Sequence, residues 1–349
     1  MTAFLTIIIP VYKVKEEYLR KCLNSLCMQT VPDFSVILID DGSPDQCGAI
    51  CDEYSEVDQR FSVIHQKNLG VSAARNAGIL KAATDWIVFV DADDWVEPQF
   101  TEILYQSCCT SDADIYIYDY YNELPGKSEK RKLKNQRGLL DETWKKAVRI
   151  APFHFFKMNG KKLAYVSHAV WNKMFRKSLI QDNSIQFEPG IKRGEDSLFL
   201  IQALQCTEKI YYIDTPLYHY RRQRESATNA ADKNISKDNE LVFQHKRAMI
   251  QKYGLSADYQ DALYASICTR LYSSMRLWYF SGENTCSSRM VKKEILDLLD
   301  REPYKSAFLK VKYKILSPEQ KIFVFLLKHK FIYFVQILVQ FRRKLKGMG

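Results

Sequence analysis

The chain has 349 residues, of which 46% are hydrophobic and 26% charged, a composition that excludes wholesale disorder and allows a large core divided between two units. Its net charge of +10 is carried by residues 305–349, where eleven Lys and Arg residues face one acid, Glu319, so the excess is a basic tail and not a nucleic-acid-binding face. The nine cysteines include no CxxC pair and no Cys/His group at zinc spacing, which excludes the usual zinc motifs and predicts free thiols in a reducing cytosol.

The first 110 residues alternate between apolar strand patterns and amphipathic helix patterns. Strands are predicted at 5–12, 34–43, 61–66 and 85–94, and helices at 17–29, 44–56, 70–84 and 97–109. Pro10 stops the first apolar run and no basic segment precedes it, so this run predicts a core strand and not a signal peptide. The alternation predicts an α/β fold with a Rossmann-like, mostly parallel sheet and a crevice at the carboxyl ends of its strands.

The rest of the chain changes character twice. The next segments are predicted to be a strand at 113–121 and a solvated basic stretch at 126–137. They are followed by a loop that opens into a helix at 194–204 and by a strand that runs into a polar loop at 209–228. From about residue 235 the pattern is helical to the end. We therefore predict a first domain at 1–228, with halves 1–112 and 113–228, and a C-terminal helical region at 229–349.

The stretch VFVDADDWVEP (88–98) places Asp91, Asp93 and Asp94 at the end of an apolar run. Carboxylates this close repel one another and lose hydration at a buried strand end. A hard divalent cation, Mg²⁺ or Mn²⁺, would offset that repulsion, because such ions are held by one or two carboxylates together with substrate phosphates. The pattern leaves one alternative open, a capped turn in which Asp93 and Asp94 begin a helix at Val96.

A second acidic motif, IDDGSPD (39–45), ends the neighbouring predicted strand. Asp40 or Asp41 can accept hydrogen bonds from a nucleobase N–H group or from ribose hydroxyls there, or can belong to a purely structural turn. No GxGxxG follows the first strand, and GxxxxGK[ST] does not occur in the sequence. These absences argue against a dinucleotide-binding or P-loop protein.

Four ordered motifs carry a resemblance to a known family. The segments TIIIPVYKVKEEYLRKCLNSLCMQT (6–30), ILIDDGSPD (37–45), NLGVSAARNAGI (68–79) and WIVFVDADDWVEP (86–98) resemble the nucleotide-sugar domain of family 2 glycosyltransferases. The likeness is close from residue 5 to about 100 and looser to about 225, through WNKMFRKSLI, GEDSLFL and YHYRRQRESAT. It implies a GT-A fold, a UDP-sugar donor, a Mn²⁺ or Mg²⁺ cofactor and a single displacement with inversion.

The resemblance also implies roles for individual residues on the donor side. Tyr12 would offer a ring face to uracil, Asp41 would accept a hydrogen bond from the base, and Arg75 would hold the base or the diphosphate. Asp91 would contact the ribose or a metal-bound water, and Asp93 would coordinate the cation. The donor-binding residues implied in this way are Pro10, Val11, Tyr12, Asp41, Arg75, Asp91, Ala92 and Asp93. Ordinary packing for Tyr12 and a surface helix charge for Arg75 are the alternatives.

Asp196, in GEDSLF, matches the base that removes the proton from the acceptor hydroxyl in the family, and Glu195 lies beside it. Because a helix is predicted to begin there, Asp196 could instead be an N-cap. The start of a helix also favours the ionised carboxylate. His219 could add a nitrogen ligand to the metal or make a structural hydrogen bond, and Arg222 or Arg224 could neutralise the diphosphate.

On the acceptor side, Asp94 could face the sugar or the acceptor. Trp171 could be a platform on which a sugar stacks, although its context favours a position in the core. Together with Glu195, these residues form the predicted acceptor or sugar set.

The tail contains two apolar stretches, 322–327 and 331–341, and neither reaches the ~20 residues that a membrane-spanning helix needs. On a helix, the basic residues fall mainly on one side; these are Lys321, Lys328, Arg342, Arg343 and Lys346. The pattern indicates interfacial helices whose basic residues face anionic head groups. The alternative is a helix that docks on its own core or on a partner in a homo-oligomer.

The sequence as a whole predicts a glycosyltransferase on the cytoplasmic face of the membrane, bound peripherally. It would move a hexose or N-acetylhexosamine from a UDP-sugar to a hydroxyl of a glycan acceptor, one linked to lipid, in the synthesis of a bacterial capsule, exopolysaccharide or wall polymer. The alternative function is a catalytically inactive glycan- or nucleotide-binding protein with the same fold. Nucleic acid is not expected as a partner.

Overall fold

The computed structural model describes residues 3–133, 136–154, 157–158, 161–162, 168–222 and 231–345. The chain divides into two compact units. Unit 1 comprises residues 1–152 and 163–222, and unit 2 comprises residues 153–162 and 223–349. Residues 153–162, which the sequence assigned to the first domain, thus group with the helical region. The predicted boundary at 228 lies outside the described residues.

Unit 1 contains a large mixed sheet with the strand order β3-β2-β1-β4-β11-β6-β12-β5, in which β7 pairs with β6 and β8 with β12. The strands β1 to β4 pair in parallel, β6 pairs in parallel with β12, and β11 and β5 run antiparallel to their neighbours. The strands are β1 (Leu5–Val11), β2 (Phe34–Asp40), β3 (Phe61–His65), β4 (Trp86–Phe89), β5 (Trp95–Val96), β6 (Ile115–Leu124), β7 (Lys127–Arg131), β8 (Gly138–Leu139), β11 (Lys173–Arg176) and β12 (Ile210–Arg221). The mostly parallel α/β sheet that the sequence predicted is therefore confirmed.

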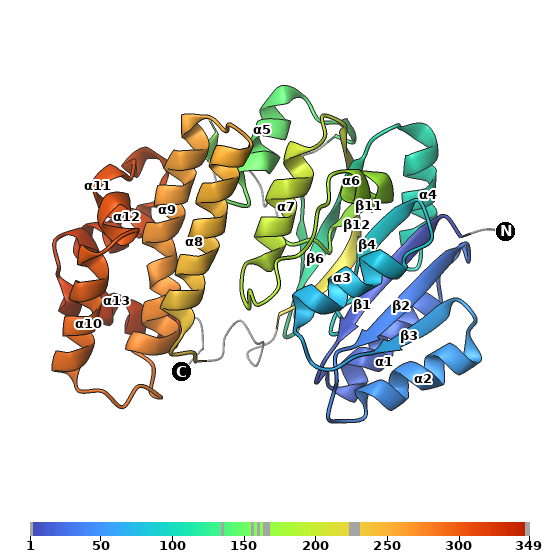
Figure 1. Ribbon diagram of the computed structural model, residues 1–349, viewed down its shortest axis with the longest axis horizontal. Helices are drawn as coiled ribbons and strands as arrows, with labels where there is room; N and C mark the ends of the chain where they lie inside the picture. The colour runs from blue at the N-terminus through green and yellow to red at the C-terminus, as the bar shows by residue number, and fades with distance from the viewer. Residues whose placement is uncertain are drawn as a thin grey trace. The chain divides into compact units, whose positions relative to one another are not determined.

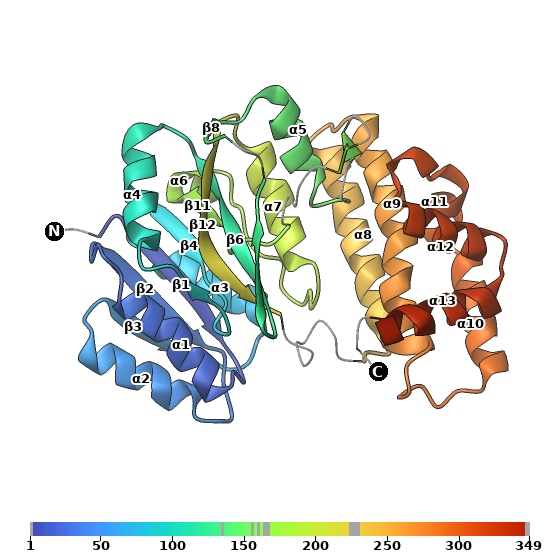
Figure 2. The same cartoon turned by 180° about the vertical axis from the view of Figure 1, so that it is seen from behind.

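Helices cover both faces of this sheet, as Figures 1 and 2 show from opposite sides. The helices of unit 1 are α1 (Glu16–Cys27), α2 (Cys47–Val57), α3 (Val71–Lys81), α4 (Phe100–Thr110), α5 (Glu142–Ile150), α6 (Lys177–Asp182) and α7 (Glu195–Gln205). Residues Leu5, Ile7 and Ile9 of β1 pack toward α1, α2 and α4, whereas Ile8 packs toward α3, α6 and α7. A strand covered on both faces has no polar side, which is why LTIIIPV reads as a continuous apolar run.

Two local predictions differ from the structure. The basic stretch at 126–137 is not simply a solvated loop, because Lys127–Arg131 forms β7 and pairs with β6 in an antiparallel ladder while most of its side chains stay exposed. Beyond β4 the chain does not continue as a strand to residue 94; it turns at Asp91–Asp94 and then forms β5, which pairs with β12. No helix begins at Val96, so the capped-helix alternative for the acidic turn is wrong.

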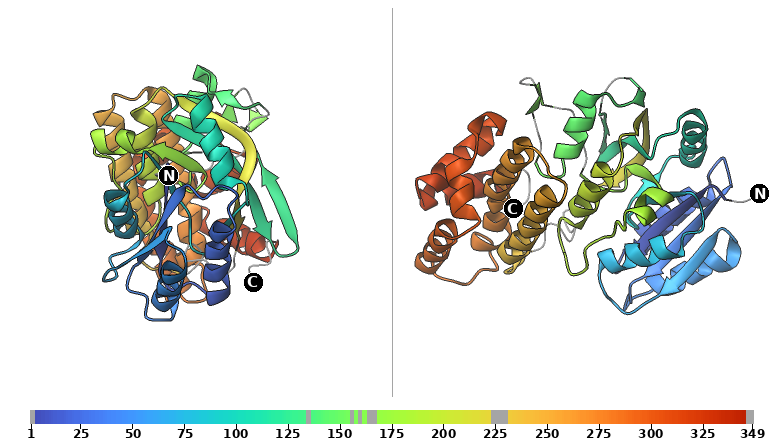
Figure 3. Two further views of the ribbon diagram at one scale, coloured as in Figure 1. Left: turned by 90° about the vertical axis from the view of Figure 1, so that its right-hand side faces the viewer. Right: turned by 45° about the horizontal axis from the view of Figure 1, so that its top comes forward.

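Unit 2 consists mainly of helices packed on one another (Figure 3, orange to red). Its elements are β9 (Lys157–Met158), β10 (Lys161–Lys162), α8 (Ile235–Lys252), α9 (Ala257–Ser274), a π-helix (Met275–Tyr279), α10 (Ser288–Asp300), α11 (Tyr304–Lys310), a 3₁₀ turn (Tyr313–Ile315), α12 (Pro318–Lys328) and α13 (Ile332–Leu345). Ser317 and Gln320 form a capping box at the start of α12, with Pro318 in its first turn. Within the described residues, no helix combines the length and the apolar character that crossing a membrane requires.

Candidate active site

The predicted donor residues gather at one edge of the sheet because β1, β2 and β4 are parallel neighbours and end together. Pro10–Tyr12 lie at the end of β1, Asp40 and Asp41 at the end of β2, and Asp91–Asp94 after β4. The side chains of Val11 and Ala92 are buried in the core, so these two residues can face a ligand only through their backbone. The ring of Tyr12 is 43% exposed, which leaves it accessible to a planar base.

Arg75 is the centre of the site. Its guanidinium is buried, and it donates from Nη1 to Asp196 Oδ1 at 2.7 Å and to Glu195 Oε1 at 3.4 Å. From Nη2 it donates to Asp91 Oδ1 at 2.9 Å. A planar guanidinium can bridge groups on different elements in this way. Arg75 is therefore neither a surface charge nor, in this structure, directed at a donor; it joins the predicted base to the acidic turn.

The start of α7 fixes the Glu195–Asp196 pair. Gly194 is the residue before the helix and has φ +100°, a left-handed conformation that favours glycine. Asp196 lies in the first turn and not at the N-cap, so the capping alternative is wrong. Its second oxygen, Oδ2, accepts from the Val170 N–H at 3.2 Å. Both oxygens of the Asp196 carboxylate thus accept hydrogen bonds within the protein.

The acidic turn is held in shape by β12. The hydroxyl of Tyr218, fully buried, accepts from the Asp91 N–H at 3.1 Å and donates to Asp94 Oδ2 at 2.7 Å. Arg221 donates its N–H to Asp94 Oδ1 at 2.7 Å and its Nε to the Asp93 carbonyl at 2.8 Å. Tyr218 and Arg221 therefore fix the backbone that presents Asp91 and Asp93. Sequence reasoning missed both residues, although they flank His219 in the YHYRR motif that it had selected.

Burial and like charge shift the titration of these acids upward. Burial raises the pKa of Asp93 to about 6, with a further contribution from the charge of Asp91. Burial and the charge of Asp196 raise the pKa of Glu195 to about 7, against the opposing effect of Arg75. Burial also raises the pKa of Asp91, although Arg75 opposes it. A cation bound beside these carboxylates would stabilise their ionised forms and so oppose the upward pKa shifts.

Asp41 has a structural function that its sequence context did not reveal. Its carboxylate accepts from Gln66 Nε2 at 2.7 Å and from the N–H groups of Leu69 and Gly70 at 2.9 and 2.8 Å. These bonds secure the loop that leads into α3 and hence into Arg75. A carboxylate offers about four acceptor positions. One therefore remains for a base, and the contact with uracil stays a prediction.

Gly42, next to Asp41, is required by sterics. It has φ +68°, and a Cβ there would lie 2.8 Å from the Asn68 backbone nitrogen. Only glycine fits where the backbone at residue 42 approaches the backbone at Asn68, which explains the glycine that follows Asp40 and Asp41.

Three predicted site residues have other functions in the structure. His219 lies with Nδ1 2.8 Å from Glu123 Oε1 and Nε2 2.9 Å from Glu97 Oε1, so both ring nitrogens are directed at glutamate carboxylates and neither is directed at the acidic turn. Asp94 is 1% exposed and both its oxygens accept protein hydrogen bonds, so it does not face a sugar. Trp171 is 5% exposed and stacks on Tyr218 at 4.6 Å, which makes it a core residue and not a sugar platform.

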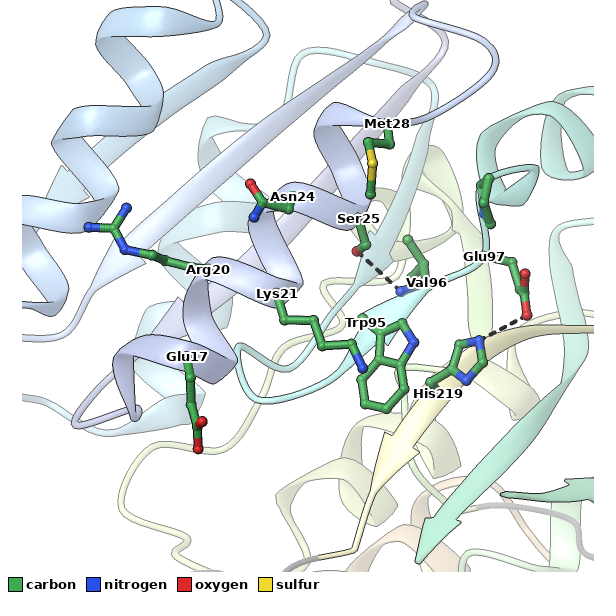
Figure 4. Close-up of a pocket in the computed structure, with 11 residues that line it drawn as sticks. Glu17, Arg20, Lys21, Asn24, Ser25, Met28, Trp95, Val96, Glu97 and His219 are labelled. Carbon is green, nitrogen blue, oxygen red and sulfur yellow. Dashed lines mark hydrogen bonds and ion pairs between the residues drawn. The ribbon is translucent and has the colours of Figure 1, made fainter. Parts of the chain in front are cut away.

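A cavity of about 490 Å³ lies beside the acidic turn (Figure 4). It is lined by residues of α1, by Trp95–Pro98 and by His219; Lys21 Nζ lies 3.2 Å from the centre of the Trp95 ring. His219 stacks on that ring at 4.7 Å. Among the described residues that line this cavity there is neither Arg75 nor any of Asp91, Asp93 and Asp196. It is therefore separate from the acidic centre.

The acidic turn fits the implied Mn²⁺ or Mg²⁺. Within the described residues, no group of three or more His, Cys, Asp or Glu side chains is arranged to hold a metal ion by itself. A hard cation in a nucleotide site needs only one or two carboxylates, because substrate phosphates and water complete its coordination. Asp93 offers carboxylate oxygens of the kind that such a cation prefers; burial and the charge of Asp91 raise its pKa to about 6, and a bound cation would offset both effects.

Comparisons with known proteins identify the family of the chain. Residues 6–183 match the family described as Glycosyl transferase family 2. The glycosyltransferase EpsH of Bacillus subtilis is 30% identical over 277 residues, which make up 76% of each chain. Glycosyltransferase GlyA of Streptococcus pneumoniae is 34% identical over 64% of this chain, which spans only 31% of the length of GlyA.

The fold is also found in a solved relative. The structure of residues 1–349 of S. aureus TarS in complex with UDP-GlcNAc has a TM-score of 0.67, with 18% identity, over 99% of this chain and 92% of that one. Sheet, site and comparisons together define a glycosyltransferase with a GT-A-like domain and C-terminal helices. The chain belongs to glycosyl transferase family 2.

Proposed function

We propose that this glycosyltransferase moves a hexose or N-acetylhexosamine from a UDP-sugar to a hydroxyl of a glycan acceptor during synthesis of a bacterial wall, capsule or exopolysaccharide polymer. The observation that carries the proposal is the contact of Arg75 with both Asp91 and Asp196, which joins the acidic turn to the predicted base. The similarity to TarS, a poly(ribitol-phosphate) beta-N-acetylglucosaminyltransferase whose structure has been solved with UDP-GlcNAc, supports the donor class and the polymer class.

In this proposal each group of residues has one task. Tyr12 and Asp41 hold the uracil and Asp91 the ribose. Asp93 would hold a Mn²⁺ or Mg²⁺ ion beside the diphosphate. When bound, the cation acts as a Lewis acid that stabilises the charge of the departing diphosphate. Asp196 accepts the proton of the acceptor hydroxyl during attack on the anomeric carbon. Because one base lies opposite the leaving group, the displacement inverts the anomeric configuration.

The donor is tested by UDP release from a panel of UDP-sugars. We expect slow hydrolysis of one UDP-hexose or UDP-N-acetylhexosamine without any acceptor, and no release from GDP- or CMP-sugars. Absence of UDP release from every member, while UDP itself binds, would leave the catalytically inactive nucleotide-binding protein as the remaining function.

The C-terminal helices support a peripheral membrane location. Val324, Leu327 and Val339 are buried, and the ring centroids of Phe323 and of Tyr272 on α9 are 5.5 Å apart. The helices α12 and α13 therefore pack on their own unit. An outer aromatic face nevertheless remains, each member being 44–59% exposed; it comprises Ile322, Phe325, Phe331, Phe334, Ile337 and Phe341. Exposed apolar surface beside basic residues suits the interface of an anionic membrane, where a lipid-linked acceptor would also lie.

We expect the protein to co-sediment with vesicles of phosphatidylglycerol and to do so less with neutral phosphatidylcholine. The Phe334→Ala/Phe341→Ala variant removes two rings of the outer aromatic face and should lose most of this binding. A control variant, Leu309→Ala, removes a 74% exposed apolar side chain of α11 and should bind as wild type does. Equal binding by all three proteins would refute the membrane assignment.

A further inference from the structure

Unit 2 contains a cavity of about 630 Å³ between the turn after α9, the beginning of α10 and one side of α13. One of its walls is formed by Tyr279, the last residue of the π-helix that follows α9. Such π-helical turns are rare and occur frequently at functional sites. The volume lies in the range of pockets that hold a small ligand. The function proposed above uses no part of this cavity.

The helix α13 contributes one face to the cavity and a different face to the exterior. Tyr333, Gln336 and Gln340 line the cavity at spacings of three and four, so they lie along one stripe of the helix. Phe334, Ile337 and Phe341 repeat the same spacing one residue later and belong to the outer aromatic face. The two stripes are offset by about 100°. The cavity and the outer face can therefore be altered independently.

The lining combines rings with neutral hydrogen-bonding groups. Tyr279, Phe280 and Tyr333 provide aromatic surface. Within the described part of the chain, neither Gln336 nor Gln340 has a hydrogen-bond partner for its side-chain amide. Each amide offers two donors and an acceptor to a ligand.

The charge of the lining narrows the class of ligand. Lys292 is the one charged side chain among the described residues that line the cavity, and no carboxylate occurs among them. A polyanion would call for several cations, and an acyl chain for a lining without amides. A neutral carbohydrate fits both parts of the lining, because the C–H face of a pyranose packs on rings while its hydroxyls bond to amides.

We propose that this aromatic–amide cavity binds a neutral oligosaccharide segment of the acceptor polymer, separately from the site of transfer. Holding the chain at a second point raises its effective concentration at the enzyme, which favours repeated use of one acceptor. The acceptor class rests on the proposed function, but binding of a glycan by unit 2 does not depend on turnover.

The test is the affinity of the full-length protein, saturated with UDP, for chitotetraose and cellotetraose, measured by calorimetry and by saturation-transfer NMR. Wild type should bind at least one of the two. Tyr333→Ala/Gln336→Ala, and the milder Gln340→Ala at an exposed position, should weaken binding, the double variant by at least tenfold. Phe334→Ala/Ile337→Ala on the neighbouring stripe is the matched control and should bind as wild type does. Thermal unfolding confirms that each variant is folded.

Three results would overturn the inference. They are failure of both sugars to bind wild type, unchanged affinity in the cavity variants, and loss of phosphatidylglycerol-vesicle binding in those variants without any sugar binding, which would make the occupant a lipid. If the wild-type protein does not turn over any UDP-sugar but the cavity variants still lose glycan binding, the proposed transferase activity is refuted and the glycan-binding cavity is supported.

Discussion

The Asp196→Asn variant is expected to transfer sugar roughly 10²–10⁴-fold more slowly than wild type at saturating donor, the usual contribution of a general base. Asparagine keeps an oxygen that can accept from Arg75 Nη1 but cannot take the proton of the attacking hydroxyl. The measurement is single-turnover transfer with the donor that the UDP-release panel identifies. Binding of UDP should change little, because the proposed donor contacts are made by Asp41, Asp91 and Asp93 and not by Asp196.

Glu195→Gln is the matched control for this prediction. It removes one negative charge from the same arginine, at 3.4 Å from Nη1, without removing the predicted base. We expect a much smaller loss of rate than in Asp196→Asn. If the two variants lose activity equally, or if Glu195→Gln loses more, the base is not Asp196 and the roles of the two neighbours must be exchanged.

The Arg75→Gln variant is expected to lose both activity and stability. Breaking a buried charge network by removing one partner costs about 3–5 kcal/mol, because the remaining charges stay buried without compensation. Here Asp91, Glu195 and Asp196 would all lose their shared cation. Urea unfolding followed by tryptophan fluorescence measures the loss in the free energy of unfolding.

The pH dependence of the free energy of unfolding of Arg75→Gln gives a second readout. The pKa of Glu195 is raised to about 7 and that of Asp91 is also raised, although Arg75 opposes both shifts, so loss of Arg75 raises them further and the folded variant binds protons on these groups more tightly than the unfolded chain does. Their burial penalty is therefore relieved as pH falls from 7 toward 5. We expect the stability deficit of Arg75→Gln to shrink over this range. Arg75→Lys should retain more stability but little activity, since an ammonium cannot bridge Asp91 and Asp196; near-normal turnover in Arg75→Lys would contradict the bridging function.

The sequence predicted the sheet and the edge at which its acids meet, because strand–helix alternation and β-branched runs are local signals. It could not predict that Arg75 would turn away from solvent to three carboxylates. Glu195 and Asp196 lie some 120 positions away, and nothing in NLGVSAARNAGI encodes that contact. The same limit applies to Trp171. Its motif could not decide between a sugar platform and a core position, because its stacking partner Tyr218 is distant in the sequence.

His219 shows a second limit of prediction from the sequence. The YHYRRQRESAT motif suggested His219 as a metal ligand, but both of its ring nitrogens are directed at glutamates. Glu97 lies on the segment after β5, and Glu123 lies on β6. Pairing of the very short β5 with β12 brings them together, and two residues are too few for periodicity to reveal a strand. Tyr218 and Arg221 were missed for the same reason, since their partners in the acidic turn become neighbours only through that pairing.

The central claim is that Asp93 holds a divalent cation together with the diphosphate of the donor, and calorimetric titration of UDP tests it most directly. Wild type should bind UDP at least tenfold more tightly with Mn²⁺ than with EDTA, and Asp93→Asn should bind weakly under both conditions. Glu17→Gln, at an exposed acid that lines the neighbouring cavity, should behave as wild type does. A wild-type affinity that EDTA leaves unchanged, or an Asp93→Asn variant that keeps the gain from Mn²⁺, would contradict the account.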